Sequence, residues 1–269
     1  MTTSEPATES ADQVVIDRRD AVLIARINRP QARNALNGAV LRGIGGAVLT
    51  AETDPEIRAL VLTGTGDRAF CAGMDLREFA DGSGQHAKSP QEREALDAYV
   101  RMAAGRTPVP VIGAANATAV GGGLELLMGC DLIVASSAAE FGFPEVKRGL
   151  FAAGGGTGVG TRIPLGIALE MLLTGERIDA ERARHIGLVN AVAAPGDVLE
   201  TAIALATTVA ANAPLGLAAS KELARLSVTD DAAATERLKH WQREVFASAD
   251  AAEGAQAFLE RRTPRWQGR

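Results

Sequence analysis

Two glutamates stand where the chain could perform acid–base chemistry. Glu125 follows three successive glycines at 121–123, which should begin a helix and place the carboxylate in its first turn. Helix N-termini present N–H groups without intrahelical partners and carry partial positive charge, so this junction suits negative charge developing on a substrate oxygen. The alternative interpretation is that Glu125 only complements the helix dipole.

The second glutamate, Glu145, ends the segment FGFPE at 141–145, in which proline stops an apolar strand. A carboxyl group among such apolar neighbours should be partly desolvated. Desolvation raises the pKa of a carboxyl toward the range useful for proton transfer. The alternative interpretation is a loop glutamate that pairs with Lys147 or Arg148.

A third segment, AFCAGMDL at 69–76, surrounds Gly73 with small residues that leave backbone N–H groups approachable. The alternative is a tight strand-to-helix turn in which glycine only relieves a dihedral constraint. Together the three segments supply two carboxylates and two junctions with exposed amides. These are the parts needed to stabilise an enolate and to move a proton at the carbon beside a carbonyl.

Other kinds of site lack their motifs. The sequence contains no G-x-S-x-G, and we assign no catalytic role to His86, His185 or His240. The glycines at 121–123 have neither the GxGxxG spacing nor the GK[ST] ending of a phosphate-binding loop. Neither C-x-x-C nor H-x-x-x-H occurs, so no metal site is expected.

The composition predicts one large globular domain with or without an appendage. The 269 residues are 46% hydrophobic, and the net charge is -5 without a run of Lys or Arg, which argues against nucleic-acid and membrane-surface partners. The two cysteines, Cys71 and Cys130, should be reduced core residues. The polar start at 1–12 should be a disordered tail, and no apolar run of about 18 residues predicts a transmembrane helix. We therefore expect a cytoplasmic protein.

The elements that must position these segments alternate between strand and helix over the first two thirds of the chain. Residues 79–91 lack an apolar period and should form a surface loop. A final strand candidate at 189–192 precedes an all-helical tail that should pack on the core or on a neighbouring subunit. The expected strands are 14–17 and 22–27 as a hairpin, 59–63, 109–114, 131–135 and 139–141, and the expected helices are 37–53, capped by Asn37, 92–104, 121–129, 197–212, 214–227, 231–246 and 250–261.

These segments in this order resemble the crotonase family, that is, the enoyl-CoA hydratase/isomerase family. AFCAGMDL is similar to the first oxyanion motif of that family, AVGGGLEL to the second, and FGFPEVKRGLFAAGGG to its second catalytic segment. Further matches are INRPQARNAL, RALVLTG, LLTGERIDAERARHIGLVNAV, APLGLAASK and AFLERRTPRW. The likeness extends over about residues 14–266.

The resemblance implies an α/β fold, a crotonase-like spiral of ββα units with a helical C-terminal trimerisation region. It divides the chain into the tail 1–12, a spiral core 13–195 and a helical region 196–269 that serves oligomerisation and covers the active site. The implied assembly is a homotrimer or a homohexamer built as a dimer of trimers. No cofactor is implied, because coenzyme A belongs to the substrate.

The resemblance also implies roles for particular residues. The backbone amides of Met74 and Gly122 would hold the thioester oxygen. Glu125 would activate water for attack on C3, and Glu145 would deliver a proton to C2 of the enolate. Contacts with the substrate or its coenzyme A are expected from Arg33, Ala35, Ala72, Asp75, Gly121, Ala153 and Arg261, with Arg262 as an alternative to Arg261.

The activity implied by both carboxylates is hydration of a trans-2-enoyl-CoA, because a water must be held while a proton is also transferred. One departure from the family pattern bears on this, since Ala152-Ala153 stands where many hydratases have Pro-Gly. The alternatives are an enoyl-CoA isomerase, or a hydratase/dehydratase for a specialised acyl-CoA. A further alternative, from another class, is a non-catalytic acyl-CoA binding protein.

Overall fold

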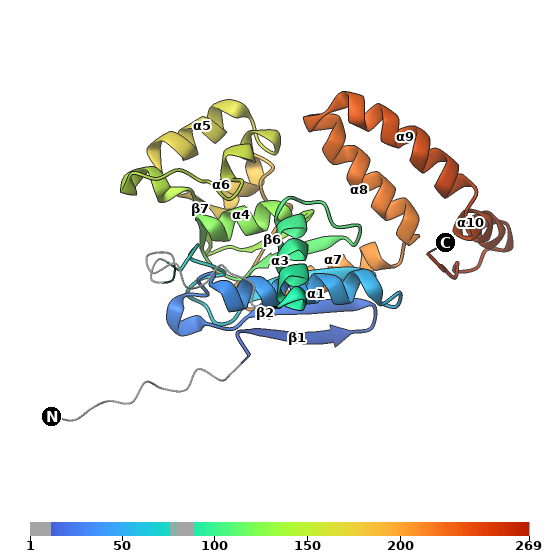
Figure 1. The fold of residues 1–269 in the computed structure, drawn as a ribbon, viewed down its shortest axis with the longest axis horizontal. Helices are drawn as coiled ribbons and strands as arrows, with labels where there is room; N and C mark the ends of the chain where they lie inside the picture. The colour runs from blue at the N-terminus through green and yellow to red at the C-terminus, as the bar shows by residue number, and fades with distance from the viewer. Residues whose placement is uncertain (1–11, 76–77, 79–88, 269) are drawn as a thin grey trace.

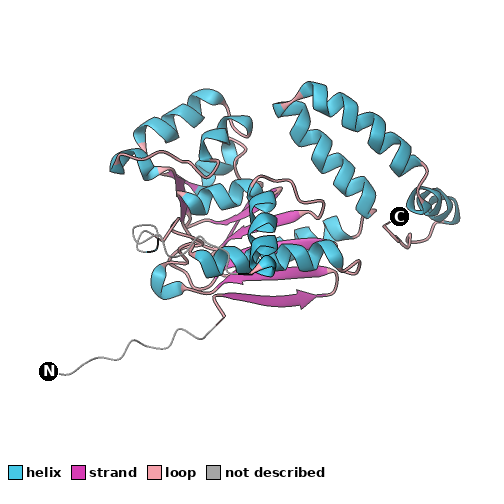
Figure 2. Cartoon of the chain, viewed as in Figure 1, coloured by secondary structure: helices cyan, strands magenta, loops and turns pink. Residues whose placement is uncertain are grey.

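A computed structural model describes residues 12–75, 78 and 89–268 of the chain. Its centre is a six-stranded sheet with the order β1-β2-β3-β4-β6-β9. The first pair is an antiparallel hairpin and each later neighbour is parallel. Helices flank this sheet in Figures 1 and 2. Its strands are β1 Val14–Arg19, β2 Val22–Ile27, β3 Ala59–Gly64, β4 Val111–Ala115, β6 Leu132–Ser136 and β9 Ala191–Ala193.

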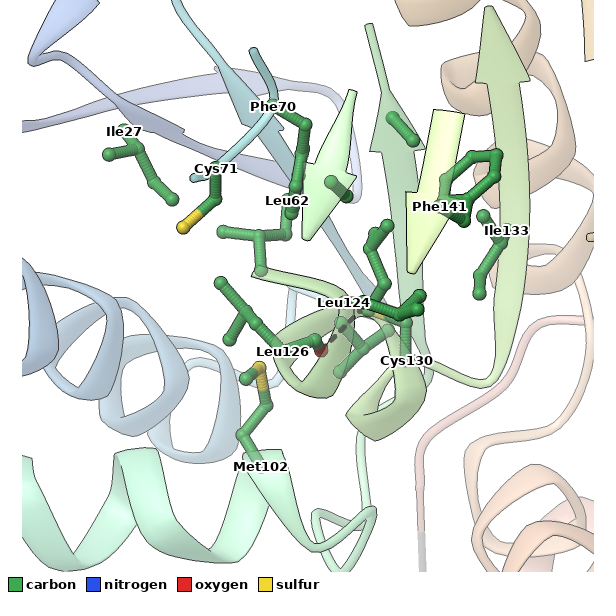
Figure 3. Packing of buried hydrophobic residues seen from close by; sticks show 14 of the residues in the cluster. Ile27, Leu62, Phe70, Cys71, Met102, Leu124, Leu126, Cys130, Ile133 and Phe141 are labelled. Carbon is green, nitrogen blue, oxygen red and sulfur yellow. Dashed lines mark hydrogen bonds between the residues drawn. The ribbon is translucent and has the colours of Figure 1, made fainter. Parts of the chain in front are cut away.

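Alternation along the strands divides the apolar residues between two cores, because successive side chains point to opposite faces of a sheet. In β2, Leu23 and Ile27 join the larger core, whereas Ile24 joins the smaller one. The larger core also contains buried residues of α1 (Gly38–Thr53), α3 (Pro90–Ala103) and α4 (Gly122–Gly129). Figure 3 shows part of it, in which Met102, Leu126 and Cys130 lie close together. The smaller core forms beneath α7 (Val198–Ala210).

A second, three-stranded sheet has the order β5-β7-β8 and borders the region expected to carry the chemistry. β5 (Ala119–Val120) pairs in parallel with β7 (Glu140–Gly142), and β7 pairs antiparallel with β8 (Ile178–Asp179). β5 leads directly into α4, and β7 leads into the 3₁₀ helix η2 (Pro144–Arg148). Because β5 and β7 are paired, the residues that follow them start from the same edge.

The remaining helices lie around the two sheets. Those after the second sheet are η3 (Gly156–Thr161, 3₁₀), α5 (Leu165–Thr174) and α6 (Ala180–His185), and η1 (Pro30–Ala32, 3₁₀) precedes α1. α8 (Pro214–Thr229) and α9 (Asp231–Phe246) stand to one side of the sheet and lead into α10 (Ala249–Glu260), as Figure 1 shows. Within the described part of the chain no single helix is long and apolar enough to span a membrane; α7 and α8 pass that test only as a pair bent by 108°.

The chain after α10 returns to the core. The carboxylate of Asp250, which is buried, accepts the backbone N–H groups of Gln267 and Gly268 at 2.6 and 2.9 Å. The indole of Trp266 donates to the carbonyl of Ala211 at 2.7 Å. The C-terminal segment therefore ties α10 to the end of α7.

Most expected elements occur, with shifted ends. The hairpin, the Asn37 cap on α1 and the four C-terminal helices are confirmed. β4 and β6 begin one or two residues later than expected, and β9 occupies Ala191–Ala193. The pattern did not predict α5. The segment 69–75 is a loop with two single bridges, Leu36 to Met74 and Cys71 to Ala119.

Two predictions fall partly or wholly outside what the structure describes. The N-terminal tail and most of the 79–91 loop lie outside the described residues. The proposed boundary at 195/196 falls between β9 and α7, and α7 packs on the main sheet. The three-part division of the chain stays a prediction.

Candidate active site

One large cavity, of about 1530 Å³, joins the segments singled out in the sequence. Its walls come from the 72–74 loop, the start of α4, η2 and the glycine-rich segment before and within η3. The end of α3, residues 104–108 and one side of α8, including Lys221 and Arg225, also line it. Glu125 and Glu145 both line it, and so do Met74 and Gly122. The structure therefore brings together the four residues expected to perform the chemistry.

The two expected oxyanion amides lie side by side. A Cβ placed on Gly122 would be 3.3 Å from the amide nitrogen of Met74, and one on Gly73 would be 3.3 Å from that of Gly122. Both approaches depend on glycine, because Gly73 and Gly121 have φ values of +98° and +57°. Among the described residues neither amide donates a hydrogen bond to another protein group. Two paired, unengaged donors at a helix N-terminus form an anion-binding arrangement.

Glu125 is fixed by a backbone donor from the glycine-rich segment. It lies in the first turn of α4, half-buried, and its Oε1 accepts the N–H of Gly156 at 2.9 Å. A Cβ on Gly154 would lie 2.5 Å from Oε2, so a methyl group there would collide with the carboxylate. The bond to Gly156 occupies one oxygen of the carboxylate, and Oε2 remains available to a water or substrate.

Glu145 lies in η2, across from the start of α4. A Cβ on Gly121 would be 3.0 Å from Oε1 of Glu145, whereas Oε2 is buried and has no hydrogen-bond partner. Burial raises the pKa of Glu145 above its ordinary value; the charge of Glu125 adds to the rise, and its own backbone amide and Arg148 oppose it. A buried carboxyl oxygen without a partner and with a raised pKa suits a proton donor.

The alternative of a surface ion pair at Glu145 does not describe this geometry. Lys147 instead pairs with Glu176 at 2.6 Å. No hydrogen bond or ion pair joins Glu145 to Arg148 within the described chain; the guanidinium acts on the carboxyl only through its charge. Glu145 therefore faces the cavity that Glu125 also lines, and it is not part of a surface ion pair with Lys147 or Arg148.

The residues expected to bind substrate fall into two groups. Ala72, Gly121 and Ala153 line the cavity. The others do not line it. Arg33 is exposed with φ +51°, the carbonyl of Ala35 accepts a hydrogen bond from Arg29 at 2.8 Å, and Asp75 pairs with Arg29 at 3.0 Å. At the other end of the chain, Arg261 caps α10 with φ +53°, and Arg262 pairs with Glu253 at 2.6 Å.

Sequence reasoning missed Gly154 and Gly156 as partners of Glu125. The signal was present in the glycine-rich run at 154–160, which no helix or strand pattern requires. It also missed Arg29, whose buried guanidinium holds Asp75 just after Met74. Cys71 and Cys130 are buried free thiols, as expected. The described residues contain no group of three or more His, Cys, Asp or Glu that could hold a metal ion.

Known proteins match this chain over nearly its whole length. The family model for enoyl-CoA hydratase/isomerase matches residues 17–269. A solved enoyl-CoA hydratase from Mycobacterium tuberculosis H37Rv superposes with a TM-score of 0.85 at 42% identity, covering 96% of this chain and 100% of that one. The curated enoyl-CoA hydratase EchA19 of M. tuberculosis is 36% identical, with 97% of this chain and 98% of the relative covered. The 2,3-dehydroadipyl-CoA hydratase of Escherichia coli K12 is 37% identical, with 96% and 99% covered.

Proposed function

The chain belongs to the enoyl-CoA hydratase/isomerase family, and from that premise we propose that it reversibly adds water across the 2,3 double bond of a trans-2-enoyl-CoA. The observation that carries the proposal is the convergence of Glu125 and Glu145 on one cavity beside two unengaged amides. A hydratase needs both carboxyl groups, since it must activate a water and protonate a carbon.

The thioester is activated by electrostatics in this proposal. Its carbonyl oxygen would accept the N–H groups of Met74 and Gly122, and the partial positive charge at the start of α4 would favour the negative charge of the enolate. Removal of one such donor in other enzymes costs about 3–4 kcal/mol of transition-state stabilisation. The pair therefore supplies a substantial share of the rate enhancement.

The two glutamates divide the proton transfers. Water attacks C3 while Glu125, held by Gly156, takes its proton, and the electrons of the 2,3 double bond move onto the thioester oxygen. Glu145, whose raised pKa favours the protonated form, then gives its proton to C2 as the enolate collapses. The proton on Glu125 returns to Glu145 through solvent before the next cycle.

We propose that the substrate is an acyl-CoA thioester and that no separate cofactor takes part. Ala72, Gly121 and Ala153 on the cavity wall are proposed to contact the thioester region. The coenzyme A contacts expected from Arg33, Ala35, Asp75 and Arg261 stay proposals. The relative named 2,3-dehydroadipyl-CoA hydratase indicates that related chains act on functionalised acyl groups as well.

We also propose a homotrimer or homohexamer in the cytoplasm. α9, all of whose residues are described, buries no side chain, and α8 buries only Ala219. Helices of this length owe most of their stability to packing of an apolar face. Phe246, Phe258 and Leu259 are 78%, 83% and 76% exposed, so the C-terminal helices offer an apolar surface to other copies of the chain. Light scattering should give three or six times the mass of the chain, and a monomer would reject this assembly.

The test is incubation of the purified protein with crotonyl-CoA and longer trans-2-enoyl-CoA substrates. The enoyl absorbance should fall, and the product should gain the mass of one water. A product of unchanged mass from a 3-enoyl substrate, without hydration, would instead identify an isomerase. Tight binding in calorimetry without turnover over a broad panel of thioesters would identify a non-catalytic binding protein.

A further inference from the structure

Two arginines bind the C-terminal end of α4, the helix whose N-terminus carries the Gly122 amide. Arg162 lies just after η3, and Arg225 belongs to α8. The last carbonyls of a helix have no intrahelical partners, and here the two guanidinium groups supply them. The distances are 3.0, 2.9 and 2.9 Å from Arg162 to the carbonyls of Met128, Cys130 and Asp131, and 3.2 Å from Arg225 to each of those of Gly129 and Cys130.

The carboxylate of Asp131 extends this contact into a network. It pairs with Arg225 at 3.0 Å and with Lys221 at 2.7 Å, and it accepts the N–H of Val111 in β4 at 2.8 Å. The Lys221 and Asp131 side chains are only 9% and 17% exposed. A partly buried ion pair with several hydrogen bonds fixes geometry more than it adds stability. The network thus sets the placement of α8 against α4 and the sheet.

Arg225 lines the cavity with one side and is crowded by Gly105 on another. A Cβ on Gly105, just after α3, would lie 2.3 Å from the guanidinium carbon of Arg225. Lys221 is equally engaged, because it also donates to the hydroxyl of Thr107 and the carbonyl of Val109 at 2.9 and 3.0 Å. The basic groups are therefore committed to protein acceptors. This argues for a structural role of Arg225, although it also lines the cavity.

α4 is short enough to transmit a displacement along its length. Its eight residues span about 12 Å at 1.5 Å per residue. We infer that Arg225 is a positioning residue for the proposed reaction: its forked guanidinium holds the C-terminal end of α4 and thereby fixes Gly122 and Glu125 at the other end. Nη2 of Arg225 donates to both carbonyls and, together with Nε, to Oδ1 of Asp131 at 3.0 and 3.3 Å. Lysine cannot replace this arrangement, because an ammonium is a compact point charge without two nitrogens held in one plane.

The inference rests on the proposed function and is tested with Arg225→Lys, which keeps the charge. We expect kcat on crotonyl-CoA to fall about tenfold or more, because misplacement of about 1 Å can cost up to about 100-fold in rate. KM should change less than about twofold, because Arg225, although on the cavity wall, donates to the α4 carbonyls and to Asp131. The matched control is Arg237→Lys in α9, which removes the two-nitrogen contact with Glu222 of α8 but keeps the charge and leaves α4 untouched, and it should retain wild-type kcat.

Hydrogen exchange of the peptide covering residues 119–130 provides a readout that needs no activity. It should quicken in Arg225→Lys and stay at the wild-type rate in Arg237→Lys. A folded Arg225→Lys protein with wild-type kcat and unchanged exchange would overturn the inference, as would a rise in KM that accounts for the whole loss. If Arg225→Lys does not fold, Asp131→Asn weakens the same grip and should slow kcat several-fold; wild-type kcat there would also overturn it.

The exchange experiment separates this inference from the proposed function. A wild-type protein without hydratase activity would reject the proposed function. Faster exchange of α4 in Arg225→Lys would still support the grip of Arg225 on that helix, and unchanged exchange would reject it.

Discussion

Substitution of Gly154 by alanine should move Glu125 and little else. The new Cβ would lie 2.5 Å from Oε2 and 3.0 Å from Cδ of Glu125, whereas ordinary van der Waals contact begins at 3.4 Å. Gly154 has no positive φ, so alanine fits its backbone. The carboxylate is the end of a flexible side chain and can give way by about 1 Å. The fold should therefore tolerate the change.

The catalytic cost follows from that displacement. A shift of about 1 Å in a reacting group can lower a rate about 100-fold, which corresponds to about 2.7 kcal/mol in the activation free energy. The movement also strains the bond between Glu125 and the N–H of Gly156, now 2.9 Å long. We expect kcat on crotonyl-CoA to fall between about 30- and 100-fold, with a smaller change in KM.

The assay is the loss of enoyl absorbance, accompanied by a thermal melt of each variant. Gly196→Ala is the matched control, because a Cβ there meets nothing within 4 Å and the residue does not line the cavity, and it should behave as wild type. In a Glu125→Gln background Gly154→Ala should add much less, since residues that act through one group are not additive. Wild-type kcat in a folded Gly154→Ala protein would refute the proposed placement of Glu125.

Three further results are expected. Gly73→Ala should lower kcat at least about tenfold, because its φ of +98° disfavours alanine and the methyl group would crowd the Gly122 amide; an unchanged kcat would contradict the paired amides. Arg148→Gln should move the alkaline limb of the kcat/KM profile to higher pH, because Arg148 lowers the pKa of Glu145 and its loss keeps that acid protonated to a higher pH. An alkaline limb that stays in place or moves to lower pH would count against Glu145 as the proton donor. Glu145→Gln should raise the free energy of unfolding at neutral pH, since burial disfavours the native carboxylate and this cost is absent below its ordinary pKa of 4.5. Melts of both proteins against pH would reject this if the gain persisted at pH 3.

Much of the architecture could be predicted from local patterns. The apolar runs of β2 and β3, the Asn37 cap and the helical periods after α7 each carry their own signal, and all are present. α5 was missed because its sequence, LGIALEMLLT, is apolar on nearly every side and so shows no one-sided helical period. Leu165, Leu169 and Leu173 on α5 are in fact exposed, so the core does not impose that period. The resemblance to the crotonase family is confirmed by the family match and by the superposed structure.

Only part of the candidate active site could be predicted from the sequence. Glu125 and Glu145 were marked by glycine and proline beside them, which are local features. Their convergence depends on the pairing of β5 with β7, a contact between distant segments that no local pattern reveals. The same holds for the N–H of Gly156, which lies at the start of η3, 31 residues after Glu125. Arg225 lies still farther along the chain and meets α4 only through the packing of α8.

A structure of the protein with a bound saturated acyl-CoA, such as butyryl-CoA, tests the central claim most directly. The thioester oxygen should lie about 2.7–3.1 Å from the amide nitrogens of both Met74 and Gly122. C2 should then face Glu145 and C3 should face Glu125. A thioester bound away from these amides, or either carboxyl group turned from the acyl chain, would contradict the account.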